Sequence, residues 1–297
     1  MSGPVSIAST RGATVTLHHL APRPAVERVL IAHATGFHGR CYGPLAAALD
    51  GFDVWALDVR GHGASPEGEE PVRWDDFGDD AAAAAAWLAA QPGSDGRIVG
   101  FGHSLGGGAL LLAAGRDPGR FRALVLFEPI VFPPNPPTRS NPLAAVARRR
   151  RRVFDSSAAA YANFASQPPM STFDPAALRS YVDGGLTPVD PAEPDGPVQL
   201  RCRPEHEAAT FEAALHTDQW ERLPGIAVPV TVLGGTIDES DPPSLLAELI
   251  AQRLPDAHYE RADELDHFGP FVAPAATAAR VATALGARRR ARVPRST

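Results

Sequence analysis

The stretch Ile98-Val99-Gly100-Phe101-Gly102-His103-Ser104-Leu105-Gly106-Gly107-Gly108 runs from an apolar segment straight into a serine flanked by glycines. A helix-forming segment, residues 109–114, follows at once. The pattern G-x-S-x-G between a strand and a helix is typical of a sharp turn, because a side chain two residues before or after the serine would collide with the neighbouring strand or helix. Since glycine- and serine-rich turns also arise by chance, the elements around Ser104 must decide whether it is a nucleophile.

Apolar runs without alternation surround this stretch, at residues 28–33, 52–57 and 121–130. Runs of this kind are typical of strands that are buried on both faces. Helical segments at 42–49 and 74–91 separate them, so strand and helix alternate along the chain. The alternation predicts an α/β fold with a mainly parallel sheet and helices on both of its faces.

The remaining segments predict an edge hairpin, an insertion and a tail. Residues 5–20 alternate apolar and polar side chains around a tight turn, as a β-hairpin does. Residues 132–225 contain proline-rich turns and short helical pieces, including one over 143–155, and predict an inserted helical cap. The core would then comprise residues 1–131 and 226–287. The arginine-rich residues 288–297 predict a disordered tail, because they have little to bury.

In this order of elements, the chain resembles the α/β-hydrolase fold family over nearly its whole length. The resemblance rests on Gly-His-Ser-Leu-Gly-Gly at 102–107, Asp-Val-Arg-Gly-His-Gly-Ala-Ser at 58–65 and Leu-Asp-His-Phe at 265–268. It implies a serine hydrolase in which the nucleophile, an acid and a histidine follow one another along the chain. The resemblance thus makes Ser104 the nucleophile and His267 the base.

Two acidic residues are candidates for the third member of this catalytic triad. Asp238 follows Gly234-Gly235-Thr236-Ile237 after a predicted strand and matches the family's acid position. Glu128 ends the strand that follows Ser104, where some members of the family keep the acid instead. The sequence favours Asp238, because the turn before it also matches, and Glu128 is the alternative acid.

The resemblance also implies two amides that stabilise an oxyanion. One is that of Leu105, and the other comes from the loop after the first parallel strand, where the family carries H-G-x-x-G. Here that loop reads His33-Ala34-Thr35-Gly36-Phe37, with alanine in place of the first glycine. We assign the second amide to Thr35. Each such donor is worth about 100- to 1,000-fold in rate.

These residues predict a hydrolase that cleaves a small carboxylic ester or related acyl compound through an acyl-enzyme intermediate, without a cofactor. Hydrolysis of a thioester, a lactone or a carbon–carbon bond would use the same residues and is the alternative. A hydrolase-fold binding protein without turnover is a third interpretation. The partner would be a small-molecule acyl substrate, and the sequence does not fix the oligomeric state.

Composition limits the other kinds of partner, bonding and location that the chain could have. The 297 residues carry a net charge of −6, which argues against nucleic acid as a specific partner. Cys41 and Cys202 cannot form a disulfide framework and lie in no His/Cys cluster, so we expect free thiols and no metal site. No apolar run is long enough to span a bilayer, and residues 1–11 lack the apolar core of a secretory signal, which predicts a cytoplasmic protein.

The five arginines Arg148 to Arg152 fall in the predicted cap helix. Consecutive residues surround a helix, so some of these side chains would be solvated and others would pair with carboxylates. Recognition of an anionic group on the substrate is the functional alternative. His206 and His216 lie in the same region. We expect them on the surface, and the alternative is that they line the substrate entrance. His103 is expected to pack beneath the turn at Ser104.

Overall fold

The computed structural model describes residues 3–23, 27–134, 141–237 and 242–291. One sheet has the strand order β1-β2-β4-β3-β5-β6-β10-β11. Its strands are β1 (Val5–Ala8), β2 (Thr14–Ala21), β3 (Glu27–Ala32), β4 (Phe52–Asp58), β5 (Ile98–His103), β6 (Phe121–Phe127), β10 (Val230–Gly234) and β11 (Ala257–Arg261). From β4 to β11 all neighbours are parallel, whereas β1 and β2 form the predicted antiparallel hairpin at one edge.

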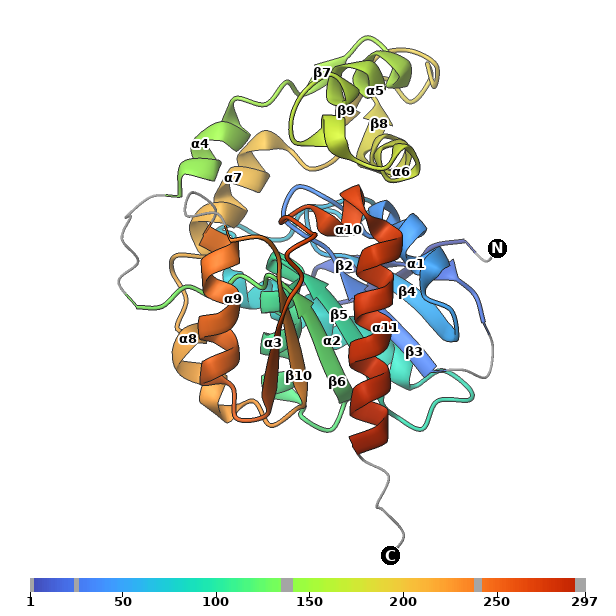
Figure 1. The fold of residues 1–297 in the computed structure, drawn as a ribbon. Helices are drawn as coiled ribbons and strands as arrows, with labels where there is room; N and C mark the ends of the chain where they lie inside the picture. Colours follow the sequence, from blue (N-terminus) through green and yellow to red (C-terminus); the bar gives the residue numbers. More distant parts are fainter. Residues whose placement is uncertain (1–2, 24–26, 135–140, 238–241, 292–297) are drawn as a thin grey trace, which may run out of the picture.

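Helices cover both faces of this sheet (Figure 1). The helices α2 (Trp74–Ala89), α3 (Leu105–Arg116) and α9 (Pro242–Arg253) belong to the hydrophobic core on one face, and α1 (Gly43–Ala48) and α11 (Pro274–Ala291) to that on the other. Because side chains of a strand alternate between faces, Leu30 of β3 joins the first core and Ile31 the second. Both are fully buried, as continuous apolar runs predict. The predicted mainly parallel α/β fold is therefore confirmed.

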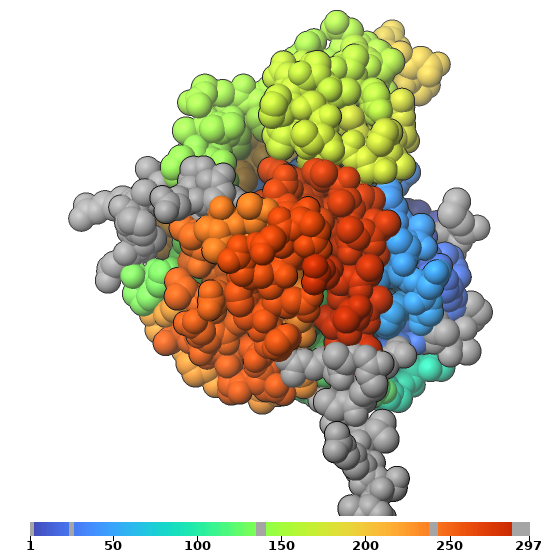
Figure 2. Space-filling model, viewed as in Figure 1, coloured from blue at the N-terminus to red at the C-terminus, as the bar shows by residue number. Residues whose placement is uncertain are grey.

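Between β6 and β10 the chain leaves the sheet. The elements there are α4 (Pro142–Arg148), β7 (Val153–Phe154), α5 (Ser157–Ala165), η2 (Met170–Thr172), α6 (Pro175–Gly185), β8 (Leu186–Pro188), β9 (Val198–Leu200) and α7 (Pro204–Ala213). We call residues 141–213 the insert. Figures 1 and 2 show it seated on one end of the core, where α6 contacts α1, α10 (Gly269–Val272) and the turn η1 (Gly39–Tyr42). After the insert, α8 (Gln219–Arg222) and η3 (Leu223–Gly225) lead back to the sheet.

The insert differs from the sequence prediction in one respect. The helix expected over 143–155 ends at Arg148, and residues 153–154 form β7 of a three-stranded antiparallel sheet with the order β7-β9-β8. Val153 pairs with Gln199, a partner far along the chain. Local helix propensity could not reveal this pairing, because long-range contacts override propensity.

The end of the chain also differs from its prediction. Helix α11 continues to Ala291, so the first four residues of the predicted disordered tail, 288–291, are helical. Residues 292–297 lie outside the described part. Among the described residues, none of the helices is both long and apolar enough to cross a membrane.

The junction of β5 and α3 brings α3 unusually close to β3. A Cβ atom on Gly106 would lie 2.0 Å from the carbonyl oxygen of Ala32, which is main chain and cannot rotate away. Gly115, near the other end of α3, has room, since its nearest neighbour would be a side-chain carbon of Ile226 at 3.9 Å. Alanine substitutions at these two glycines of the same helix therefore test how closely α3 approaches β3.

We predict that Gly106→Ala lowers the free energy of unfolding by about 2 kcal/mol or more, because α3 must move away from β3. In contrast, Gly115→Ala should be neutral or stabilise by up to about 1 kcal/mol, because alanine favours helix. Urea denaturation followed by circular dichroism measures both. If Gly106→Ala is as stable as the wild type, the described approach of α3 to β3 is incorrect.

Candidate active site

Ser104 occupies the turn between β5 and α3 in a strained conformation. Its φ and ψ angles are 55° and −117°, a region that a non-glycine residue adopts at a cost of roughly 1–3 kcal/mol. The surrounding structure holds the turn in place. The carbonyl oxygen of Ser104 accepts hydrogen bonds from the N–H groups of Gly107 at 3.0 Å and Ile130 at 3.1 Å. Its own N–H donates to the carbonyl of Phe127 at the end of β6.

His267 and Glu128 meet in a short hydrogen bond beside this turn. His267 Nδ1 donates to Glu128 Oε2 at 2.6 Å, and the other carboxylate oxygen accepts the N–H of Gly235 at 2.8 Å. Glu128 is fully buried, so neither bond competes with bulk water. With the proton on Nδ1, the Nε2 atom of His267 carries a lone pair and can act as a base.

Glu128 reaches His267 because its backbone turns sharply after β6. Its φ angle is 43°. Among the described residues, Arg11, Ser104 and Glu128 are the non-glycine residues with positive φ, and two of these three belong to this cluster. Backbone strain of this kind gathers at functional sites. Asp238, the acid that the sequence favours, lies outside the described residues.

The two predicted oxyanion amides lie in the turns that follow β5 and β3. The N–H of Leu105 belongs to the first turn of α3, and Thr35 lies in the turn after β3. Within the part of the chain that the structure describes, neither N–H donates to a protein acceptor. The neighbouring N–H of Ala34, by comparison, is occupied by Tyr42 Oη at 3.1 Å. The free donors of this region thus include the two that sequence analysis assigned.

A buried hydrogen-bond chain joins this turn to His267. The hydroxyl of Tyr42 donates to His103 Nδ1 at 2.8 Å, and His103 Nε2 donates to the carbonyl oxygen of His267, also at 2.8 Å. Burial lowers the pKa of His103 well below its usual value, which keeps the ring neutral as this arrangement requires. His103 lies beneath the turn as expected, but nothing in the sequence points to Tyr42 as its partner.

The arginine run contributes one half-buried residue, Arg150, beside the turn that follows β3. Arg150 donates to Glu207 at 2.5 Å and to the hydroxyl of Tyr181 at 2.6 Å. The pair lies against Gly36, where an added Cβ would be 2.4 Å from Glu207 Oε1. Arg148 pairs instead with Glu212 on the exposed face of α7. The expectation that some of these arginines pair with carboxylates is therefore confirmed.

Comparisons with known proteins agree with this fold. A family model described as the alpha/beta hydrolase fold matches residues 28–274. Lipase LipV of Mycobacterium tuberculosis is 38% identical over 104 residues, which cover 35% of this chain and 38% of the lipase. The 2-(acetamidomethylene)succinate hydrolase of Mesorhizobium japonicum is 30% identical over 168 residues, covering 54% of this chain and 58% of that enzyme. The matches thus span less than two thirds of either relative.

Solved structures show the same architecture over almost the whole chain. The peroxisomal alpha-beta-hydrolase Lpx1 of Saccharomyces cerevisiae superposes with a TM-score of 0.78, covering 99% of this chain and 90% of that one. The two sequences are 17% identical. At that identity the likeness concerns the fold, and the chemistry must be argued from the residues described above.

The chain of Tyr42, His103 and His267 generates a prediction about the reactivity of Ser104. Tyr42→Phe should slow the labelling of Ser104 by a fluorophosphonate probe roughly tenfold, because it leaves two buried polar groups unpaired and releases the loop of His267. Tyr161→Phe, in the insert, is the matched control, since the ring of Tyr161 contacts the guanidinium of Arg179. Equal labelling rates for Tyr42→Phe and wild type would contradict the positioning role.

Proposed function

This chain belongs to the α/β-hydrolase fold family, and from that premise we propose that it is a serine hydrolase that cleaves a small carboxylic ester or related acyl compound. The observation that carries the proposal is the 2.6 Å hydrogen bond from His267 to the buried Glu128, beside a serine in a strained turn. A serine, a histidine and an orienting carboxylate are the elements of nucleophilic acyl transfer. The names of the two relatives, a lipase and a succinate-derivative hydrolase, support this class.

In the first step, Ser104 Oγ attacks the acyl carbon while His267 Nε2 takes the hydroxyl proton. The carbonyl oxygen becomes an oxyanion, which the N–H groups of Leu105 and Thr35 stabilise. His267 then gives its proton to the leaving group as the bond to the acyl carbon breaks. In the second step, a water molecule loses a proton to His267 as its oxygen attacks the acyl carbon. The bond from the acyl carbon to Ser104 Oγ then breaks, His267 returns the proton to Oγ, and the acid is released. Glu128 stays ionised throughout and stabilises the imidazolium.

We assign the triad acid to Glu128 in place of Asp238. The N–H of Gly235 binds one oxygen of Glu128, which leaves the other oxygen oriented toward His267. A buried carboxylate with a fixed partner fixes the histidine tautomer that base catalysis needs. The match of Asp238 to the family pattern rests on the turn before it, and Gly235 in that turn donates to Glu128.

The insert would form the cap over the substrate pocket. Its Arg150 and Glu207 lie against Gly36, directly after the proposed oxyanion donor Thr35. Ligands of α/β sheets bind at the carboxyl ends of the strands, which is where β3 leads into this turn. Arg150 and Tyr181 line the same small hollow as Gly36, and their paired side chains would give this side of the proposed substrate site a polar wall. Thioesters and lactones would use the same triad.

The first test is Ser104→Ala against a panel of esters, thioesters and lactones of increasing acyl length. We expect kcat to fall by more than about 1,000-fold on every compound that the wild type hydrolyses, because no other group can form the acyl-enzyme. Labelling by a fluorophosphonate probe should vanish in the same variant. Hydrolysis that survives the substitution would belong to another site and would contradict the proposal.

The second test distinguishes the two acids. Glu128→Gln should lower kcat roughly 1,000- to 10,000-fold, since an amide stabilises the wrong tautomer of His267 and cannot balance the imidazolium charge. Asp238→Asn should keep kcat within about threefold of the wild type, because that residue would not contact His267. Steady-state kinetics on the best substrate of the panel measures both. The opposite pattern would move the acid to Asp238.

A further inference from the structure

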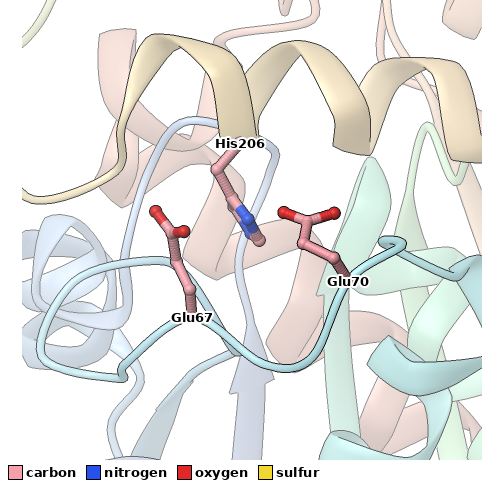
Figure 3. Close-up of side chains that lie close together, drawn as sticks. All are labelled: Glu67, Glu70 and His206. Atoms are coloured by element: carbon pink, nitrogen blue, oxygen red, sulfur yellow. The ribbon is translucent and has the colours of Figure 1, made fainter.

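Away from the proposed triad, Glu67, Glu70 and His206 come together where the insert meets the core (Figure 3). The two glutamates lie in the loop between β4 and α2, and His206 belongs to α7 of the insert. One nitrogen or oxygen atom from each residue lies within 4.8 Å of the other two. The imidazole ring lies between the two carboxylates in the close-up. Nothing in the proposed hydrolysis uses this cluster.

His206 has one ring nitrogen without a partner. The surface position that the sequence predicts for this residue is wrong, because only 3% of it is exposed. Its Nε2 atom donates to the carbonyl oxygen of Arg60 at 3.3 Å. The proton on Nε2 leaves a lone pair on Nδ1, which is buried and has no hydrogen-bond partner among the described residues. A buried polar atom without a partner is costly, so a ligand that accepts this lone pair would stabilise the fold.

The two carboxylates supply the charge that a cation needs. Glu67 is held by Arg203, which donates to both of its oxygens, with Nε at 2.6 Å from Oε1. Each carboxylate oxygen has two lone pairs, so Glu67 can bind Arg203 and a cation together. Glu70 is exposed, and no described residue forms an ion pair with it. Its carboxylate is therefore not committed to another cation of the described part.

We propose that Glu67, Glu70 and His206 bind one divalent transition-metal ion, of which Zn²⁺ fits the donor set best. Carboxylate oxygen and imidazole nitrogen are both ordinary zinc ligands, whereas Ca²⁺ and Mg²⁺ prefer oxygen alone. The hydrogen bond from Nε2 to a backbone carbonyl is the one that metal-ligating histidines usually make. Neighbouring ligands of tetrahedral zinc lie about 3.4 Å apart, so the three ligand atoms, which lie within 4.8 Å of one another, would move closer together on binding.

Bound there, the ion would join the loop before α2 to helix α7. The same loop carries Arg60, whose carbonyl holds His206 and whose guanidinium pairs with Asp80 of α2. The cation would thus fix the insert to the core without taking part in the reaction at Ser104. Composition gave no indication of such a site, because its ligands come from separate segments and include no cysteine.

The test uses the purified full-length chain, stripped with EDTA, dialysed and titrated with ZnCl₂. We expect one equivalent to bind by isothermal titration calorimetry, and Tm to rise by about 2 °C at a tenfold excess over Kd. Glu70→Gln should weaken Zn²⁺ binding at least about tenfold and remove the Tm shift. Because Glu70 is exposed, this variant should keep the metal-free Tm of the wild type.

Two further variants keep the result unambiguous. Glu69→Gln is the matched control, because it removes the same charge one residue away from Glu70. The side chain of Glu69 pairs with Arg11 at 3.4 Å and is not part of the cluster. The Glu69→Gln variant should bind Zn²⁺ as the wild type does. His206→Gln, like Glu70→Gln, should bind Zn²⁺ more weakly than the wild type. The proposal is overturned if the wild type binds no Zn²⁺, or if Glu70→Gln binds it as tightly as Glu69→Gln does.

Discussion

The contact between His267 and Glu128 depends on two backbone turns at the ends of neighbouring strands. Ser104 after β5 and Glu128 after β6 both have positive φ, and the main chain ties the two turns together. Ser104 N–H donates to Phe127, the residue before Glu128, while the N–H of Glu128 donates to Leu233 of β10. The parallel pairing of these strands therefore supports the strain at both residues. Without it, neither the serine nor the carboxylate would be held in place.

The framework of the site was predictable from sequence because its signals are local. Apolar runs such as 98–103 identify the central strands, and glycine spacing around Ser104 identifies the turn. The family resemblance adds His267. The partner of His267 was not predictable in the same way, because the reach of Glu128 depends on a backbone angle that no residue type dictates. The only sequence signal for Glu128 was its position at the end of the strand next to β5. The turn before Asp238, which matched the family, outweighed that signal.

The contacts of the insert were even less predictable from the sequence. The short strand β7 forms because Val153 pairs with Gln199, and Arg150 is half-buried because it bonds to Glu207 and Tyr181. Each contact joins segments that are far apart in the chain, so local propensity and charge patterning cannot reveal them. The burial of His206 has the same origin, since Arg60 of the core supplies its partner. The sequence therefore predicts an insertion between the strands, but not the contacts that the insert makes.

These contacts converge on the loops that follow β3 and β4. Asp58, at the end of β4, accepts the N–H of Gly39 at 2.6 Å and that of Ala64 at 2.7 Å, so one buried carboxylate joins both loops. Although burial opposes it, hydrogen bonding to His18 keeps the pKa of Asp58 well below its usual value, and the group stays ionised. The insert then closes on both loops, through Glu207 at Gly36 and through His206 at the carbonyl of Arg60. The turn that holds Thr35 is therefore shaped from two sides, by the core beneath it and by the insert above.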